Sequence, residues 1–137
     1  MTLPLDSLPT WILGSAATRS HQVLHKRLAE AGVTGYEYRC LTSLAATDHV
    51  SQTQLGAAAS LDPRDVTHTV RTLEARGLVS RDRDPSHGRR LMVSLTATGR
   101  RTAEGLAPVM AAVQEEVFGR LGTEERSTLL RLLKRVG

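Results

Sequence analysis

Aromatic residues are scarce in this chain: one Trp, two Tyr and one Phe make up 3% of its 137 residues. A nucleic-acid platform that stacks bases on aromatic rings is therefore not expected. The single cysteine excludes an internal disulfide framework. No apolar run is long enough to span a bilayer, and the first ten residues lack the basic and apolar segments of a secretory signal. These absences favour a cytoplasmic protein with no membrane contact, and the length suits one domain with its own core.

The residue patterns of common enzymes are also missing. The chain has no phosphate-cradling glycine loop and no nucleophile elbow, and its five histidines are scattered. His21 and His25 are four residues apart and suit one side of a helix, but a third metal ligand is not obvious. We therefore predict a protein that is not an enzyme and that has no catalytic residue, metal site or cofactor.

Positive charge is concentrated in one part of the chain. Residues 62–101 contain nine arginines and five acidic residues, and the difference of +4 equals the formal net charge of the whole chain. A basic stretch of this kind is expected of a polyanion-binding surface. The alternative is an ordinary solvated face that happens to be rich in arginine.

Hydrophobic periodicity predicts a series of helices before this stretch. One helix is expected over 11–31, with Thr10 as its cap. A second is expected over 36–45, with inward-facing residues Tyr38, Leu41, Leu44 and Ala45. A short helix over 53–59, with Ser51 as its cap, is followed after a tight turn by a longer helix over 62–77. Two helices joined in this way predict a helix-turn-helix.

The helix over 62–77 has strong start and stop signals. Asp62 suits the N-cap, Pro63 the first helical position and Gly77 the end. Its apolar residues gather on one face, and the opposite face carries Arg64, Thr67, His68 and Arg71. We predict that this second face binds DNA, against the alternative of a solvated helix face.

At the start of the preceding helix, Thr53 and Gln54 are candidates to bind a DNA phosphate through free N–H groups. A plain surface turn is the equal alternative.

After Gly77 the residue pattern changes to that of strands. The segments LVSRD and LMVSLT flank RDPSHG, which is a turn cluster. They predict a β-hairpin wing whose tip carries Arg89 and Arg90, and arginine at such a tip suits a narrow minor groove. An ordinary exposed turn is the alternative for these two. Arg81 and Arg83 are expected to face phosphate or solvent.

Helical patterns return over 98–121 and in the last segment, with Thr123 as its cap. The first helix and the last two carry more apolar surface than a small winged lobe can cover. We therefore expect them to pack together and against a second copy of the chain. The predicted fold class is mainly α (α+β), with a winged helix-turn-helix lobe, a small β-hairpin wing, and terminal helices that form a dimerisation region.

With its predicted helices and wing in this order and spacing, the chain resembles the MarR family of dimeric winged-helix regulators. The matching residues run from about 35 to 100, and the most specific pieces are LEARGLV after the helix and DP…RR…V.LT..G across the wing. The resemblance implies a single MarR-like domain over 1–137. Its DNA-binding lobe would span 36–96, and its helical dimerisation region would comprise 1–32 and 97–137.

The resemblance also implies a function and assigns roles to residues. It implies a homodimeric transcriptional regulator, most often a repressor, that binds a pseudo-palindromic operator and is released by a small ligand. The exposed face of 62–77 maps onto the recognition helix, and Arg89, with Arg90 beside it, maps onto the wing-tip arginine. Family wings often carry an acidic residue next to that arginine. Here His87 and Gly88 precede Arg89 instead, so Asp84 is expected to steady it.

In this family a ligand pocket tends to lie where the dimer helices meet the DNA lobe. The candidates here are Trp11, Arg19, His21 and His25, which would suit an aromatic carboxylate. In the alternative, Arg19 forms a structural ion pair and Trp11 packs at the dimer seam.

Two other functions remain open. Some members of the family sense peroxides through a cysteine, but Cys40 lies among apolar neighbours and is expected to be a small core residue. The other alternative is a winged-helix module that binds a protein partner.

Overall fold

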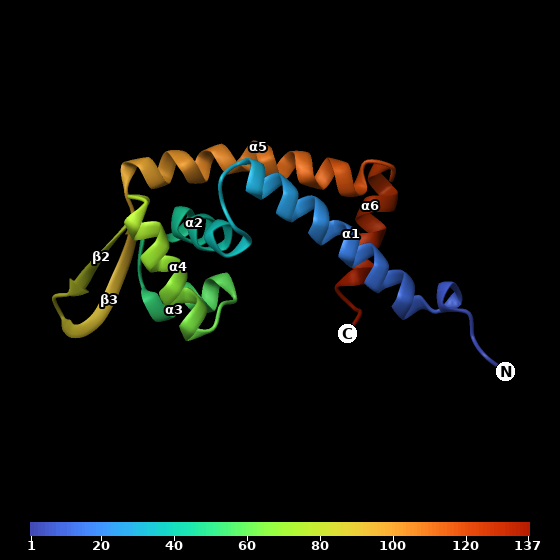
Figure 1. The fold of residues 1–137 in the computed structure, drawn as a ribbon, viewed down its shortest axis with the longest axis horizontal. Helices are drawn as coiled ribbons and strands as arrows, with labels where there is room; N and C mark the ends of the chain where they lie inside the picture. The colour runs from blue at the N-terminus through green and yellow to red at the C-terminus, as the bar shows by residue number, and fades with distance from the viewer.

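The computed structural model describes all 137 residues and confirms the predicted fold class. Figure 1 shows an elongated molecule, with the β2–β3 hairpin at one end and both termini on the side of α1 and α6. The elements in chain order are η1 (Leu5–Ser7), α1 (Pro9–Glu30), α2 (Gly35–Thr47), β1 (His49–Ser51), α3 (Gln52–Ala59), α4 (Pro63–Ala75), β2 (Val79–Asp84), β3 (His87–Leu95), α5 (Ala97–Phe118) and α6 (Thr123–Leu133).

Local side-chain caps start the helices of the winged lobe. The Ser51 hydroxyl accepts from the N–H of Gln54, and the Gln54 side chain accepts from the N–H of Ser51. Asp62 accepts from the N–H of Asp65, which confirms it as the N-cap of α4. The backbone leaves α4 through Gly77, whose φ of 72° suits a residue without a Cβ.

Two predicted caps and one predicted core residue are wrong. Helix α1 begins one residue before Thr10, because Pro9 occupies its first turn and needs no N–H there. Helix α6 begins at Thr123 itself, after Gly122, whose N–H donates to the Glu125 carboxylate. Ala45 is exposed, because the inward face of α2 ends at Leu44 and the next residue is turned about 100° away from it.

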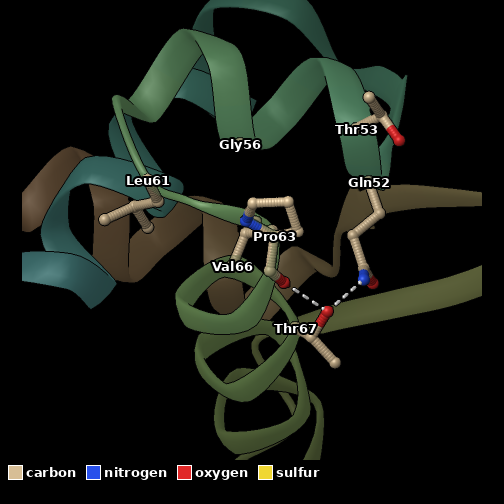
Figure 2. A pocket seen from close by; sticks show the side chains of 7 residues that line it. All are labelled: Gln52, Thr53, Gly56, Leu61, Pro63, Val66 and Thr67. Carbon is tan, nitrogen blue, oxygen red and sulfur yellow. Dashed lines mark hydrogen bonds between the residues drawn. The ribbon is translucent and has the colours of Figure 1, made fainter.

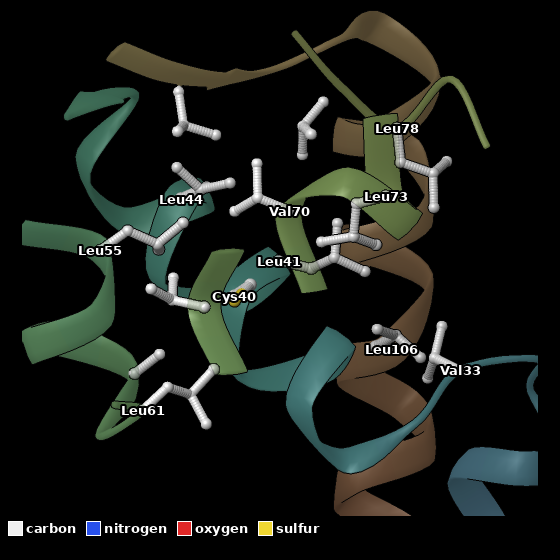
Figure 3. Packing of buried hydrophobic residues seen from close by; sticks show 14 of the residues in the cluster. Val33, Cys40, Leu41, Leu44, Leu55, Leu61, Val70, Leu73, Leu78 and Leu106 are labelled. Atoms are coloured by element: carbon white, nitrogen blue, oxygen red, sulfur yellow. The ribbon is translucent and has the colours of Figure 1, made fainter. Parts of the chain in front are cut away.

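The hydrophobic core lies in the winged lobe and joins all of its elements (Figure 3). Leu41 and Leu44 from α2, Leu55 from α3 and Val70 and Leu73 from α4 are fully buried. Val93 from β3 and Leu106 from α5 complete the same cluster. This packing holds α3 and α4 in a fixed relation to the sheet. None of the helices is long and apolar enough to cross a membrane.

The sheet is small and antiparallel, with the strand order β1-β3-β2. Strand β3 pairs with β2 from Leu95 to Leu91, and the register then shifts between Arg83 and Asp84. Only Pro85 and Ser86 separate the two strands of the hairpin. The turn is therefore shorter than the predicted cluster RDPSHG, and the placement of Arg89 and Arg90 at the tip is wrong. They belong to β3, at the point where its pairing with β2 is interrupted.

Candidate nucleic-acid interface

Helix α4 is divided between the core and solvent as its sequence predicts. Its buried face is formed by Val66, Thr69, Val70 and Leu73. On the opposite face Arg64, His68 and Arg71 are exposed, and Thr67 is half-buried. Neither arginine takes part in a salt bridge. Their guanidinium donors are free for an external acceptor such as a phosphate or a guanine edge.

Helices α3 and α4 meet closely at the turn between them. A Cβ on Gly56 would lie 3.2 Å from both the Leu61 carbonyl oxygen and a methyl group of Val66, so little more than a glycine fits there. A small cavity of about 110 Å³ adjoins this contact. Figure 2 shows Gln52, from the start of α3, reaching across the cavity to Thr67 on α4. The Gln52 Nε2 donates to the Thr67 Oγ1 at 3.0 Å, so a side-chain bond links the two helices.

The start of α3 offers less to a phosphate than its sequence suggests. The N–H of Gln54 is not free, because it donates to the Ser51 hydroxyl at 3.1 Å. The Gln54 side chain is also engaged in this capping box. Thr53 is exposed at the same helix end and stays a candidate.

The wing exposes two arginines through its irregular register. Arg83 donates to the Gly88 carbonyl oxygen at 2.8 Å across the interrupted part of the hairpin. Arg89 and Arg90 are exposed, and neither forms a salt bridge. The expectation that Asp84 steadies Arg89 is wrong, because the Asp84 carboxylate accepts from the N–H of Ser86 and so closes the tight turn.

Other arginines of the basic stretch are neutralised inside the protein. Arg81 binds Glu74 through both carboxylate oxygens, at 3.2 and 2.9 Å, so the expectation that Arg81 faces phosphate or solvent is wrong. Hydrogen bonding from Arg81 lowers the pKa of Glu74. Arg100 binds the exposed Asp48 at 2.8 Å. Arg83 and Arg101 form no salt bridge but donate to neutral oxygens of the protein. The arginines of 62–101 with neither a salt bridge nor a side-chain hydrogen bond therefore lie on the outer face of α4 and on β3.

Arg76 holds the end of α4 against the preceding helices. It donates to the buried Glu37 carboxylate at 2.6 Å and to the Gly32 carbonyl oxygen at 3.0 Å. Glu37 also accepts from the N–H of Thr34 and so caps α2. No local pattern predicts this pair, because the two residues are 39 positions apart and neither stands in a recognisable motif.

Cys40 is a core residue, as predicted. Its side chain is fully buried, and this burial raises the pKa of the thiol to about 11. At pH 7 only about one thiol in ten thousand is then ionised, and the thiolate is the form that reacts with peroxides. The geometry gives the redox-sensing alternative no support.

The four ligand-pocket candidates are all exposed on α1, and they do not form one site within a chain. The rings of His21 and His25 stack with their centroids 6.1 Å apart, and the His25 ring lies beside Gly35 at the start of α2. Trp11 lies about 21 Å from His25 along the helix axis, and Arg19 projects from nearly the opposite side of α1 to His21. No group of three or more His, Cys, Asp or Glu residues is placed to hold a metal ion.

Comparison with known proteins identifies relatives of the whole architecture. The model of the MarR family matches residues 33–91, from the start of α2 into the wing. The HTH-type transcriptional repressor Rv2887 of Mycobacterium tuberculosis is 33% identical over 110 residues, which are 80% of this chain and 79% of the relative.

Solved structures match nearly the whole chain. A protein of Pseudomonas aeruginosa described as a "probable transcriptional regulator" is 30% identical, with a TM-score of 0.86 and coverage of 98% of this chain and 100% of the other. The PcaV transcriptional regulator of Streptomyces coelicolor, solved in complex with its natural ligand, is 26% identical. Its TM-score is 0.83, with coverage of 99% of this chain and 96% of the other.

Proposed function

Because the chain belongs to the MarR family of DNA-binding transcriptional regulators, which are not enzymes, we propose that it acts as a homodimeric repressor. In this proposal the dimer binds a pseudo-palindromic operator and leaves it when a small ligand binds. One observation carries the proposal: Arg64 and Arg71 on the outer face of α4, and Arg89 and Arg90 on β3 of the wing, are exposed and form no salt bridge. The relative from M. tuberculosis is named a repressor, which supports that direction of control.

The two basic elements suit the two grooves of B-DNA. Helix α4 has the dimensions of a major-groove ligand, and Arg64 and Arg71 lie two turns apart on its outer face. Arg89 and Arg90 project from a narrow hairpin, which suits the minor groove, where the negative potential is strongest at narrow sites. His68 and Thr67 on α4, with Thr53 at the start of α3, complete the proposed contact surface.

Dimerisation accounts for apolar surface that a single chain leaves uncovered. Seven large apolar residues are exposed on α1 and around α6, at the end away from the wing: Trp11, Ile12, Leu13, Leu130, Leu132, Leu133 and Val136 (Figure 1). Exposed apolar residues gathered at one end of a molecule mark an interface. We propose that residues 1–32 and 97–137 pair with a second copy, and that 36–96 form the DNA-binding lobe.

The salt dependence of DNA binding tests this function. A dimer carries eight of the proposed arginines, so the slope of log affinity against log salt concentration is expected to be about −4 to −7, if half to all of them meet phosphate. The probe is a DNA duplex selected by the protein from a random pool, and light scattering measures the mass of the bound and free protein. Monomeric protein, or the absence of salt-sensitive DNA binding, contradicts the proposal and favours a module that binds a protein partner.

We place the ligand of this repressor at the junction of α1 and α2. His21 and His25 form the part of the site that one chain supplies. Trp11 and Arg19 lie elsewhere on α1, so we propose that the second protomer supplies them. Imidazole and guanidinium donors suit a small aromatic carboxylate. The ligand-bound structure of the PcaV relative supports a small-molecule effector in general.

A thermal-shift assay tests the ligand site with benzoate and its hydroxylated derivatives as probes. An active compound is expected to raise the melting temperature and to release DNA. Replacing His25 or Arg19 with alanine is expected to abolish both responses without loss of DNA binding, whereas His87→Ala in the wing keeps the thermal response. If Arg19→Ala unfolds the protein instead, Arg19 is a structural residue and the site assignment fails.

A further inference from the structure

We propose that Thr67 reads a thymine in each half-site through its methyl group and not through its hydroxyl. Thr67 would then be a specificity-determining residue that presents a methyl group to the DNA between Arg64 and Arg71. The inference rests on the proposed function, because it takes α4 as the helix that enters the major groove.

Thr67 occupies the right part of α4 for contact with a base. It is the fifth residue of the helix, and recognition helices meet base edges with their N-terminal residues. Arg64 and Arg71 stand three residues before it and four residues after it, so all three side chains share one face. The two arginines would hold the helix on the DNA with Thr67 between them.

The hydroxyl of Thr67 already makes two hydrogen bonds inside the protein. Its Oγ1 donates to the Pro63 carbonyl oxygen at 2.7 Å and accepts from the Gln52 Nε2 at 3.0 Å. Figure 2 shows the hydroxyl directed at these two partners and the methyl group pointing away from both. If the Gln52 amide were turned over, its oxygen would accept the hydroxyl proton instead. In both orientations the one proton of Thr67 is used, so none is left to donate to a base.

Gln52 is committed to this arrangement. Its side chain is half-buried, and its bond to Thr67 is the one hydrogen bond that its amide group makes in the chain. The Gln52 Oε1 is buried without any partner, so no competing bond pulls the amide away from α4. The Thr67 side chain is therefore held in one rotamer, with its methyl group turned away from Gln52 and from the Pro63 carbonyl (Figure 2).

An outward methyl group distinguishes thymine from the other bases. Thymine is the one base that carries a methyl group in the major groove, and contact between two methyl groups removes apolar surface from water. Burial of one such group corresponds to about a fourfold change in affinity. With one contact in each half-site of a dimer, the expected total is about 15-fold.

The test removes one methyl group at a time, from the DNA and from the protein. In a duplex selected by the wild-type protein, thymines at symmetric positions are replaced in pairs by uracil, which lacks only the methyl group. Wild-type protein is expected to lose about 15-fold in affinity at one such pair. Thr67→Ser keeps the hydroxyl and loses the methyl group, so it should bind the thymine and uracil duplexes equally. Its affinity for both should be close to that of the wild-type protein for the uracil duplex.

Thr67→Val is the converse variant, since it keeps an outward methyl group and loses the hydroxyl. It is expected to retain the preference for thymine over uracil, and thermal unfolding checks that both variants are folded. A serine variant that still prefers thymine at that position, or wild-type binding without any dependence on a thymine methyl group, overturns the inference alone. A wild-type protein that binds no DNA overturns the proposed function and this inference with it.

Discussion

Replacing Gly99 with alanine is expected to destabilise the protein by about 3 kcal/mol, at the upper end of the usual cost of overpacking. Gly99 lies in the first turn of α5, where a Cβ would stand 1.8 Å from the carbonyl oxygen of Leu78. That obstacle is backbone, and it is held in place because the Leu78 oxygen also accepts from the N–H of Thr96 at 3.1 Å. The added methyl group must therefore separate the start of β2 from the start of α5.

Urea unfolding followed by circular dichroism measures this effect, at one protein concentration because a dimer's stability depends on it. Gly105→Ala is the matched control in the same helix, since a Cβ at Gly105 has nothing within 4 Å. It should stabilise the protein by about 0.5–1 kcal/mol, because alanine favours the helix. Equal stability of the two variants would show that the start of β2 and the start of α5 can separate at little energetic cost.

Replacing Arg89 with alanine is expected to weaken operator binding at least about 30-fold and leave the melting temperature nearly unchanged. Arg89 is exposed on β3 and forms no salt bridge, so the fold loses no ion pair with it. A dimer loses two cations from two minor-groove contacts, each worth about 1–3 kcal/mol. The slope of log affinity against log salt concentration should become shallower by about 2 if both meet phosphate.

The paired arginine of the same wing provides the control for this experiment. The double variant Glu74→Ala/Arg81→Ala removes a wing arginine together with its partner and leaves the net charge unchanged. Because that pair is satisfied inside the protein and partly exposed, its loss should cost less than about 1 kcal/mol of stability and change DNA affinity less than about threefold. Unchanged DNA affinity in Arg89→Ala would show that the wing does not contact the operator.

Local sequence was sufficient for the element order and for the main features of the helix-turn-helix. Asp62, Pro63 and Gly77 mark the ends of α4 because capping and turn preferences act between residues a few positions apart. The exposed face of α4 could be predicted for the same reason, since helical periodicity decides which side chains share a side. The cap predictions that failed for Thr10 and Thr123 miss the N-caps Leu8 and Gly122 by two positions and by one, because neither of these helices starts on a side-chain cap.

The partners of individual charges depend instead on how distant elements pack. Nine arginines in 62–101 look alike in the sequence, yet Arg76 and Arg81 are bound to carboxylates and Arg89 is not. Asp84 closes a turn and does not reach Arg89, because the register shift in the hairpin decides which groups face each other.

Local patterns were thus enough to predict the helices, the wing, the basic stretch and the family. Which cations remain free, and how the Thr67 hydroxyl is engaged, follow from the packing of elements that are distant in the chain. A side chain's availability is set by the nearest partners in space, and the pattern along the chain does not contain them.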